Sequence, residues 1–271
     1  MKEIKIGKRN NTYQLIMTLK SNRTKRFEEK LLFVEGVRNI NLAIKYGWKV
    51  KHWIYGTYKN LSGWAKDTIA ANKTQENFSF SQELLAEISG KTDTSELMAI
   101  FEIKQMKVDA KKNTCPLFVL FDRPSKKGNL GSIIRTADAF GVNGIIVTGH
   151  AVDLYDPEVM AASMGSYFTM PIEKIDTNND FIEKIQYLRD KFPGLQLIST
   201  TELGTENIRT IDYKKPTMIM IGNEAMGLSK FLLENSDIQV KIPMMGEASS
   251  LNASCAGSIF IYEAFMQRIK N

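Results

Sequence analysis

The sequence contains very little cysteine and histidine. Two cysteines, Cys115 and Cys255, and two histidines, His52 and His150, occur among 271 residues. The cysteines lie far apart and form no CxxC pair, so neither a disulfide framework nor a metal site is predicted, and we expect both to be small core residues. Because neither histidine lies in the glycine-containing segments described below, imidazole acid–base catalysis is not expected.

Long apolar runs are also missing. No run approaches the roughly 20 residues that a membrane-spanning helix requires, and residues 1–5 lack the apolar centre of a signal peptide. With 43% apolar and 24% charged residues, the composition is that of an ordinary globular protein, and the length favours two domains. We therefore expect a cytoplasmic protein.

Positive charge is concentrated at the start of the chain. Residues 1–60 hold 14 Lys and Arg against 4 Asp and Glu, a net charge of +10 within a total of +6. A basic half attached to a near-neutral body is typical of a protein that binds a polyanion, although a solvated basic face has the same composition. Arg23, Lys25 and Arg26, which interrupt an apolar helical pattern, are the candidate nucleic-acid contacts in this half.

Short elements of both kinds alternate in the first hundred residues. The expected elements are a helix within 13–30, a strand over 31–34, a helix over 37–44, a strand over 53–55 and a helix over 62–72. This alternation predicts a small α/β domain over residues 1–105. The polar residues 106–115 have no apolar period and form the expected linker.

Continuous apolar runs characterise the rest of the chain. The predicted strands are 116–121, 144–148, 195–199 and 217–221, and the predicted helices are 130–140, 179–191 and 229–235. Uninterrupted apolar strands alternating with helices predict a mostly parallel sheet that is covered on both faces. The second domain is therefore expected over residues 116–271, with a ligand beyond the carboxyl ends of its strands.

A dinucleotide-type glycine fingerprint is absent. The turn after the first strand of this domain, residues 122–131, lacks the GxGxxG spacing, which argues against a nicotinamide cofactor and against the commoner methyltransferase fold. No HExxH, P-loop or Ser/His/Asp pattern occurs either. The chemistry must therefore be sought in other loops.

Three segments combine glycines with small polar side chains. They are NLGSIIRTADAFG at 129–141, IGNEAMGLS at 221–229 and IPMMGEASSLNAS at 242–254. Arg135 is the one cation of an otherwise small and apolar helix, so we expect it to reach inward to an anion. The structural alternatives are that Asn129 is a helix N-cap, that Arg135 is a surface residue, that Glu224 is an exposed loop carboxylate, and that Ser249 or Ser250 caps the last helix.

Together, the three segments resemble the motifs of the SpoU/TrmH family, the RNA 2'-O-ribose methyltransferases of the SPOUT class. The resemblance covers nearly the whole chain, strongly over 116–268 and loosely over about 10–102. It implies a trefoil-knotted catalytic domain that holds S-adenosylmethionine (SAM), a preceding domain similar to a ribosomal RNA-binding protein, and a homodimer. It implies no metal.

The resemblance also implies roles for individual residues. The implied catalytic residues are Arg135, Glu224, Ser250 and Asn252; the implied cofactor contacts are Thr200, Gly222, Asn223, Gly227, Ile242, Met244 and Leu251; and Asn129 is an implied RNA contact. Because a free guanidinium is a very poor base, we favour a positioning and electrostatic role for Arg135 over that of a base. We also expect that Gly222→Val blocks SAM and leaves folding largely intact.

The sequence and the resemblance leave three possible functions. Methylation of ribosomal RNA is preferred over methylation of tRNA, because the tRNA members of the family usually extend the catalytic domain with short helices and lack a separate N-terminal domain. A catalytically idle RNA-binding or ribosome-assembly module is the third possibility, against which Arg135, Glu224, Ser250 and Asn252 argue.

Overall fold

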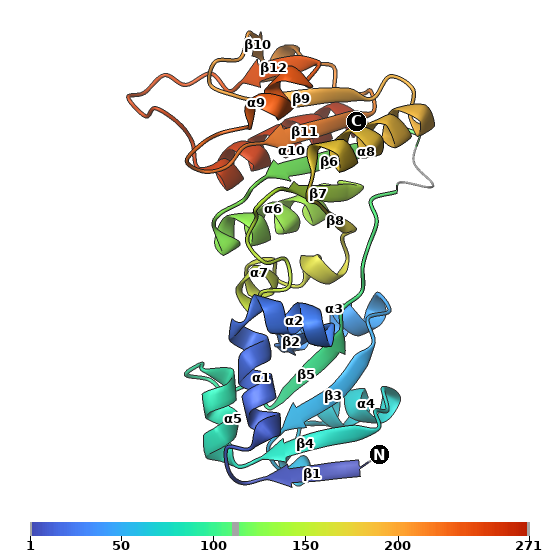
Figure 1. Cartoon of the computed structure of the whole chain (residues 1–271), viewed down its shortest axis with the longest axis vertical. Coiled ribbons are helices and arrows are strands. Elements are labelled where there is room, and N and C mark those ends of the chain that lie inside the picture. The colour runs from blue at the N-terminus through green and yellow to red at the C-terminus, as the bar shows by residue number, and fades with distance from the viewer. Residues whose placement is uncertain (1, 110–113, 270–271) are drawn as a thin grey trace. The chain divides into compact units, whose positions relative to one another are not determined.

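The computed structural model describes residues 2–109 and 114–269, so part of the expected linker over 106–115, residues 110–113, lies outside the described residues. The chain forms two compact units (Figure 1). Unit 1 comprises Met1–Lys104 together with Asp153–Thr169, and unit 2 comprises Gln105–Val152 together with Met170–Asn271. A segment from the middle of the chain therefore packs with the N-terminal residues.

Unit 1 is built on a five-stranded mixed sheet in the order β1-β4-β3-β5-β2. The strands are β1 (Lys2–Ile6), β2 (Leu31–Glu35), β3 (Val50–Tyr55), β4 (Glu76–Phe80) and β5 (Leu97–Glu102). β4 pairs in parallel with β1 and β3, whereas β5 is antiparallel to both β2 and β3. The predicted α/β character of this part of the chain is confirmed.

Helices cover this sheet. They are α1 (Asn11–Ser21), α2 (Arg23–Glu29), α3 (Val37–Lys45), α4 (Gly63–Ala71), α5 (Gln82–Ser89) and α7 (Pro157–Ala162), with 3-10 turns at Tyr58–Asn60 and Ser166–Phe168. The single helical pattern within 13–30 is two helices, because Asn22 leaves helical geometry and its side chain accepts from the Lys25 N–H as the N-cap of α2.

A buried ion cluster joins α2 to the segment 153–169 within unit 1. The Arg26 side chain is 1% exposed, and its guanidinium lies 2.7 Å from the Asp153 carboxylate and 3.5 Å from that of Asp156. It also donates to the Leu19 carbonyl at 2.6 Å. A buried arginine requires such partners, so this cluster fixes the middle segment onto the N-terminal helices.

Unit 2 contains a seven-stranded sheet in the order β10-β12-β9-β11-β6-β7-β8. The strands are β6 (Leu117–Asp122), β7 (Gly144–Thr148), β8 (Ile172–Ile175), β9 (Gln196–Thr200), β10 (Glu206–Asn207), β11 (Thr217–Ile221) and β12 (Ile238–Lys241). Every pair of neighbours is parallel. The predicted parallel sheet is confirmed, and its central strands are buried along their whole length.

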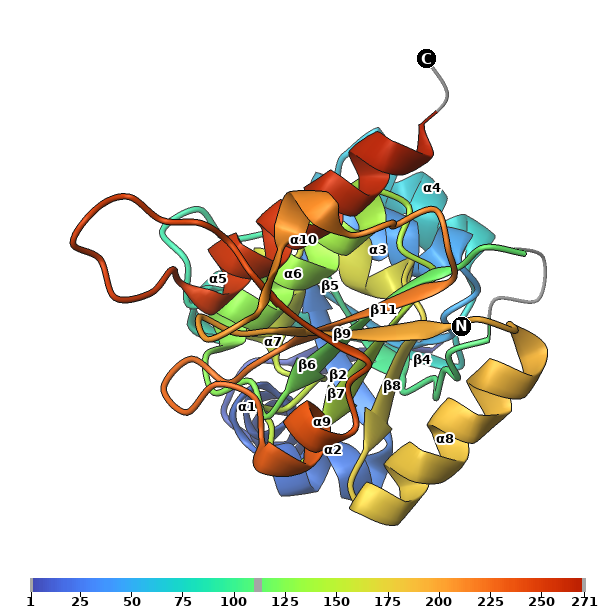
Figure 2. The ribbon, with the colours of Figure 1, turned by 90° about the horizontal axis from the view of Figure 1, so that it is seen from above.

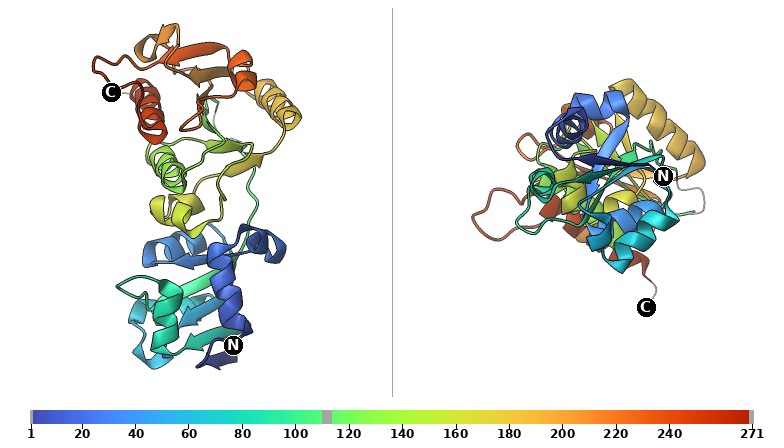
Figure 3. Two further views of the ribbon diagram at one scale, coloured as in Figure 1. Left: turned by 60° about the vertical axis from the view of Figure 1, so that its left-hand side comes forward. Right: turned by 90° about the horizontal axis from the view of Figure 1, so that it is seen from below.

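The helices of unit 2 cover both faces of this sheet. They are α6 (Lys127–Ala139), α8 (Asn178–Lys191), α9 (Lys230–Glu234) and α10 (Ala253–Arg268), with a 3-10 turn at Ile208–Thr210. Figure 2 and the left view of Figure 3 place α6 and α10 on one side of the strands and α8 on the other. Gly257 permits close packing of α10, because a Cβ there would lie 2.4 Å from Ile221 and 2.6 Å from Ile133.

Within the described residues, no helix has the length and apolarity needed to cross a membrane. The trefoil knot implied by the resemblance stays a prediction.

Candidate functional site

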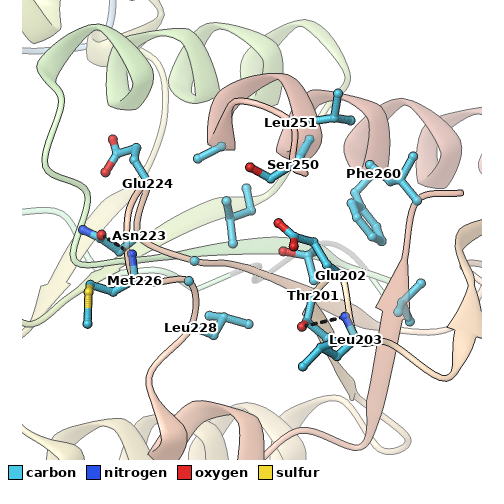
Figure 4. A pocket seen from close by; sticks show the side chains of 18 of the residues that line it. Thr201, Glu202, Leu203, Asn223, Glu224, Met226, Leu228, Ser250, Leu251 and Phe260 are labelled. Carbon is cyan, nitrogen blue, oxygen red and sulfur yellow. Dashed lines mark hydrogen bonds between the residues drawn. The ribbon is translucent and has the colours of Figure 1, made fainter. Parts of the chain in front are cut away.

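A cavity of about 390 Å³ opens at the carboxyl ends of β9, β11 and β12 (Figure 4). Its wall comes from the residues that follow these strands, at 200–203, 221–228 and 242–244, and from the start of α10 at 250–260. The parallel arrangement of the strands brings these segments, distant in sequence, to one edge of the sheet. The volume lies within the range of small-molecule and cofactor sites, about 300–1,000 Å³.

All seven residues predicted as cofactor contacts line this one cavity. They are Thr200, Gly222, Asn223, Gly227, Ile242, Met244 and Leu251. Sequence reasoning did not identify Thr201, Glu202, Leu203 and Phe260, which line it too. Residues 201–203 follow a strand that was predicted correctly, so their position at its carboxyl end was the available signal.

The loop after β11 is held in a tight turn by its own polar groups. Asn223 and Gly227 exchange two backbone hydrogen bonds of 3.0 Å, and the Asn223 Oδ1 accepts from the Ala225 and Met226 N–H groups. Gly227 has a φ of +65°, which a glycine adopts without strain. Arg123, the residue after β6, anchors this loop, since its carbonyl accepts from Asn223 Nδ2 at 2.7 Å and its guanidinium donates to the Gly227 carbonyl at 3.2 Å.

Gly222 and Gly204 are sites of close backbone approach. A Cβ on Gly222 would lie 2.4 Å from the Gly227 carbonyl carbon and 2.5 Å from the Leu228 nitrogen. A Cβ on Gly204 would lie 2.6 Å from the Val240 carbonyl carbon. The expectation that Gly222→Val leaves folding largely intact is therefore wrong, because the valine collides with the backbone of its own loop before it reaches any ligand.

Glu224 fastens the same loop to the start of α6. Its Oε2 accepts from the Ser125 N–H at 2.9 Å and from the Ser125 hydroxyl at 2.6 Å. Its Oε1 accepts from the Lys126 N–H at 3.1 Å and from Asn129 Nδ2 at 2.9 Å. Partial burial raises the pKa of this carboxyl, but the hydrogen bonds from Ser125 and Asn129 outweigh it, so the net shift of the pKa is downward.

Asn129 connects Glu224 to the start of α10 through further hydrogen bonds. Its Oδ1 accepts from Asn252 Nδ2 at 3.2 Å and from the Ser254 hydroxyl at 3.3 Å. The Asn252 Oδ1 in turn accepts from the Ser254 and Cys255 N–H groups, so Asn252 is the N-cap of α10. The alternatives that named Ser249 or Ser250 as this cap, and Asn129 as the cap of α6, are wrong; Lys126 holds the latter position without a side-chain bond.

Ser250 and Arg135 differ in their relation to the cavity. Ser250 is exposed and lines it, close to Leu251 in Figure 4. Arg135 does not line it, and its side chain is exposed on α6. The expectation of an inward-reaching arginine is wrong for this chain, because Arg135 shares an exposed helical stripe with Ser132 and Ala139. Within the described residues it has no hydrogen bond or ion pair.

The remaining predictions concern the three basic residues of the N-terminal half, the two cysteines and a metal site. Arg26 is buried in its ion cluster and has no surface for RNA. Lys25 pairs with Glu28 and Glu29 on the surface of α2, and the Arg23 guanidinium lies 5.7 Å from the centre of the Phe27 ring. The expectation for the cysteines is wrong, since Cys115 is half-buried and Cys255 is exposed. In the described part of the chain, no three His, Cys, Asp or Glu side chains gather to hold a metal ion.

Sequence reasoning missed Asp122, the last residue of β6, and Ser125, in the loop after it, which both organise the site. Asp122 is 2% exposed, and its carboxylate accepts from the Thr148 hydroxyl at 2.8 Å and from the Ser229 N–H at 2.9 Å. It therefore ties β6 to β7 and to the start of α9. An acid that ends a buried apolar strand was the signal that could have identified it.

Known proteins match both the fold and the sequence. The sequence model of the SpoU rRNA Methylase family matches residues 116–262, and that of the SpoU L30e-like domain matches residues 10–99. The chain is 38% identical over 267 residues to the 23S rRNA (uridine(2479)-2'-O)-methyltransferase of Streptomyces viridochromogenes, with 98% of this chain and 93% of that protein covered.

Solved structures also match the fold of this chain. The SpoU methyltransferase AviRb from Streptomyces viridochromogenes in complex with the cofactor AdoMet superposes with a TM-score of 0.90 at 38% identity, covering 96% of this chain and 98% of that one. The AdoMet-bound rRNA methyltransferase from Sinorhizobium meliloti gives a TM-score of 0.84 at 28% identity, with 99% of each chain covered. The resemblance drawn from the three motifs is confirmed, and the chain belongs to the SpoU rRNA methylase family.

Proposed function

We propose that this protein transfers a methyl group from SAM to a ribose 2'-hydroxyl of ribosomal RNA. The observation that carries the proposal is that two of the three motif segments line one cavity, while the third is joined to them through Asn129, which hydrogen-bonds to Glu224 and to Asn252. Two relatives that align over most of this chain are described as rRNA methyltransferases, and two were crystallised with AdoMet.

The cavity suits SAM by size and by surface. Its volume of about 390 Å³ is adequate for a nucleoside with an amino-acid side arm. Loop backbone at Gly222 and Ile242 can hydrogen-bond an adenine, while Leu228, Leu251 and Phe260 supply apolar walls. When bound, SAM supplies an electrophilic methyl group on a sulfonium whose departing thioether needs no acid catalyst.

In this proposal, the residues of the network hold the reacting groups in place. Glu224 is a positioning residue, because all four of its hydrogen bonds go to the start of α6 and fix the loop after β11 against that helix. The Ser250 hydroxyl, on the loop before α10, lies at the cavity where it can contact the target ribose. Alignment of this kind supplies much of the rate enhancement of a group transfer.

Arg135 is proposed to bind a phosphate of the RNA beside the target ribose. Its guanidinium is exposed and has no protein partner among the described residues, so it is available to an anion. Because a guanidinium stays protonated in proteins, Arg135 acts by position and charge and does not remove the hydroxyl proton.

A homodimer is proposed from an apolar stripe on α10. Ile259, Tyr262, Met266 and Ile269 are each 39–49% exposed and recur at helical spacing along one face. The Phe140 ring lies 5.5 Å from that of Tyr262 and extends the stripe toward α6. Light scattering should give twice the mass of the chain for the wild type, and half that value for Ile259→Asp if this face is the interface.

We propose that unit 1 binds the RNA through its exposed lysines. Because the proposed substrate is ribosomal RNA, we also propose that the protein acts in the cytoplasm. The test is transfer of labelled methyl from SAM to purified ribosomal subunits, naked rRNA and tRNA in parallel. Methylation of rRNA substrates alone supports the proposal, and methylation of tRNA alone contradicts the choice of substrate. SAM binding without transfer to any RNA would favour the idle RNA-binding module.

A further inference from the structure

The cavity carries negative charge without any positive charge in its wall. Among the described residues that line it, Glu202 and Glu224 are acidic and none is Lys, Arg or His. The nearby Arg123 guanidinium is committed to the Asp122 carboxylate at 2.9 Å. A wall of this kind disfavours phosphate-bearing ligands and favours a cationic one.

The two acids differ in their bonding. Both oxygens of Glu224 are occupied, each accepting two hydrogen bonds from the start of α6. Glu202 has no hydrogen bond or ion pair within the described part of the chain. It stands on the loop after β9, and Figure 4 shows its carboxylate directed into the cavity toward Ser250 and Leu251. Glu202 is therefore the cavity acid that accepts no hydrogen bond from the described protein, and its side chain is exposed.

We propose that Glu202 makes this cavity discriminate between the cationic methyl donor and its neutral product. The inference rests on the proposed function. In the transfer, the bond between sulfur and methyl breaks with its electron pair left on sulfur, a bond between the ribose oxygen and methyl forms, and the hydroxyl proton leaves to solvent. The bound cofactor thus changes from a sulfonium to an uncharged thioether, S-adenosylhomocysteine (SAH).

The carboxylate attracts the donor more strongly than the product. Both molecules carry the same ammonium, carboxylate and ribose groups, so contacts to those groups cancel in the comparison. The remaining difference is one unit of positive charge. At a separation of several ångströms, in a cavity open to water, one carboxylate changes the affinity of a unit charge by about threefold to tenfold. Glu202 therefore favours loading of SAM and release of SAH.

This role is distinct from catalysis. Positive charge on sulfur decreases as the reaction proceeds, so a fixed negative charge stabilises the bound donor more than the transition state. Removing the charge should therefore raise the single-turnover rate slightly at saturating SAM, because the bound donor is no longer stabilised relative to the transition state. Substitution of a residue that only supports the fold would not raise this rate, and it would not weaken SAM selectively relative to SAH.

The experiment is isothermal titration calorimetry on the full-length chain with SAM, SAH and sinefungin. Sinefungin replaces the sulfonium with a carbon bearing an ammonium, so it keeps the positive charge without the sulfur. The variants are the wild type, Glu202→Gln and Glu202→Ala, and the matched control is Glu183→Gln, which removes an exposed acid on α8. Both Glu202 variants should weaken SAM and sinefungin by about threefold to tenfold and SAH by less than twofold.

The alternative results are distinct. Equal weakening of SAM and SAH would overturn the inference, because it would place Glu202 against a group that both molecules share. Unchanged binding of all three ligands would overturn it as well. A folded wild type that binds no SAM would instead contradict the proposed function.

Discussion

Replacing Glu224 with glutamine tests whether this carboxylate holds the loop after β11 against α6. The carboxylate accepts four hydrogen bonds, two at each oxygen. Glutamine keeps one oxygen. If its NH₂ group takes the place of Oε2, the Ser125 hydroxyl can turn and accept from it, but the Ser125 N–H loses its acceptor. With about 1 kcal/mol for this lost bond at a half-exposed group, and a further 0.3–1 kcal/mol for the lost charge at a helix N-terminus, the free energy of unfolding should fall by about 1–2 kcal/mol.

The pH dependence provides a second measurement of the same contact. Because the folded-state pKa of Glu224 is lowered, its contribution is fully present above the unfolded-state pKa of about 4.3 and is lost as the pH falls through the folded-state value. The difference in stability between wild type and Glu224→Gln should therefore be constant near neutral pH and shrink in acid.

The assay is denaturant unfolding at pH 7 and at a series of acidic pH values, with Glu183→Gln as the control for loss of one surface charge. Single-turnover methylation of the same variant should fall as well, since the loop lines the cavity. Equal unfolding free energies for wild type and Glu224→Gln at pH 7 would refute the reasoning.

Four further predictions follow from the same structure. Gly222→Ala should destabilise the fold by about 3 kcal/mol or more, whereas Gly246→Ala, where a Cβ meets open space, should be nearly neutral; equal melting temperatures would contradict the close approach. Arg135→Ala should preserve stability and SAM affinity yet lower single-turnover methylation at saturating RNA about 10²-fold or more, and Arg135→Lys should restore little, because a point charge lacks the planar fork; near-wild-type turnover of the alanine variant would rule out its role. Arg26→Met should cost about 3–5 kcal/mol of unfolding free energy, since it leaves Asp153 and Asp156 buried without their cation, and a change below 1 kcal/mol would show that the cluster is dispensable. RNA affinity should decrease with salt, with a logarithmic slope of about −0.7 to −0.9 for each phosphate neutralised, and an affinity independent of salt would remove the basic residues from recognition.

The parallel sheet and the cavity loops could be predicted because local sequence determines them. A strand such as Thr217–Ile221 is apolar at every position, which is typical of a strand buried on both faces. The glycines and polar residues that follow it then lie at the carboxyl edge, where cofactor residues were expected and where the cavity lies.

The directions of single side chains were harder to predict. Arg135 looked buried because its neighbours in sequence are small and apolar, yet the helix turns it to the exposed stripe. Arg26 looked like a surface cation, and it is buried because its carboxylate partner Asp153 lies 127 residues away in the chain. Gly222 looked like a ligand contact alone, whereas the backbone of its own loop occupies the space beside it. The errors at Arg26 and Gly222 concern a partner that is distant in sequence and a close approach of backbone segments, which a local pattern does not contain.

The most direct test of the central claim is to map ribose 2'-O-methylation across all rRNA and tRNA of cells with and without this gene. The account predicts one rRNA ribose that is methylated in the wild type, unmethylated in the deletion, and restored by the wild-type gene but not by Arg135→Ala. Identical rRNA methylation maps in the two strains, or a lost methyl group confined to tRNA, would contradict it.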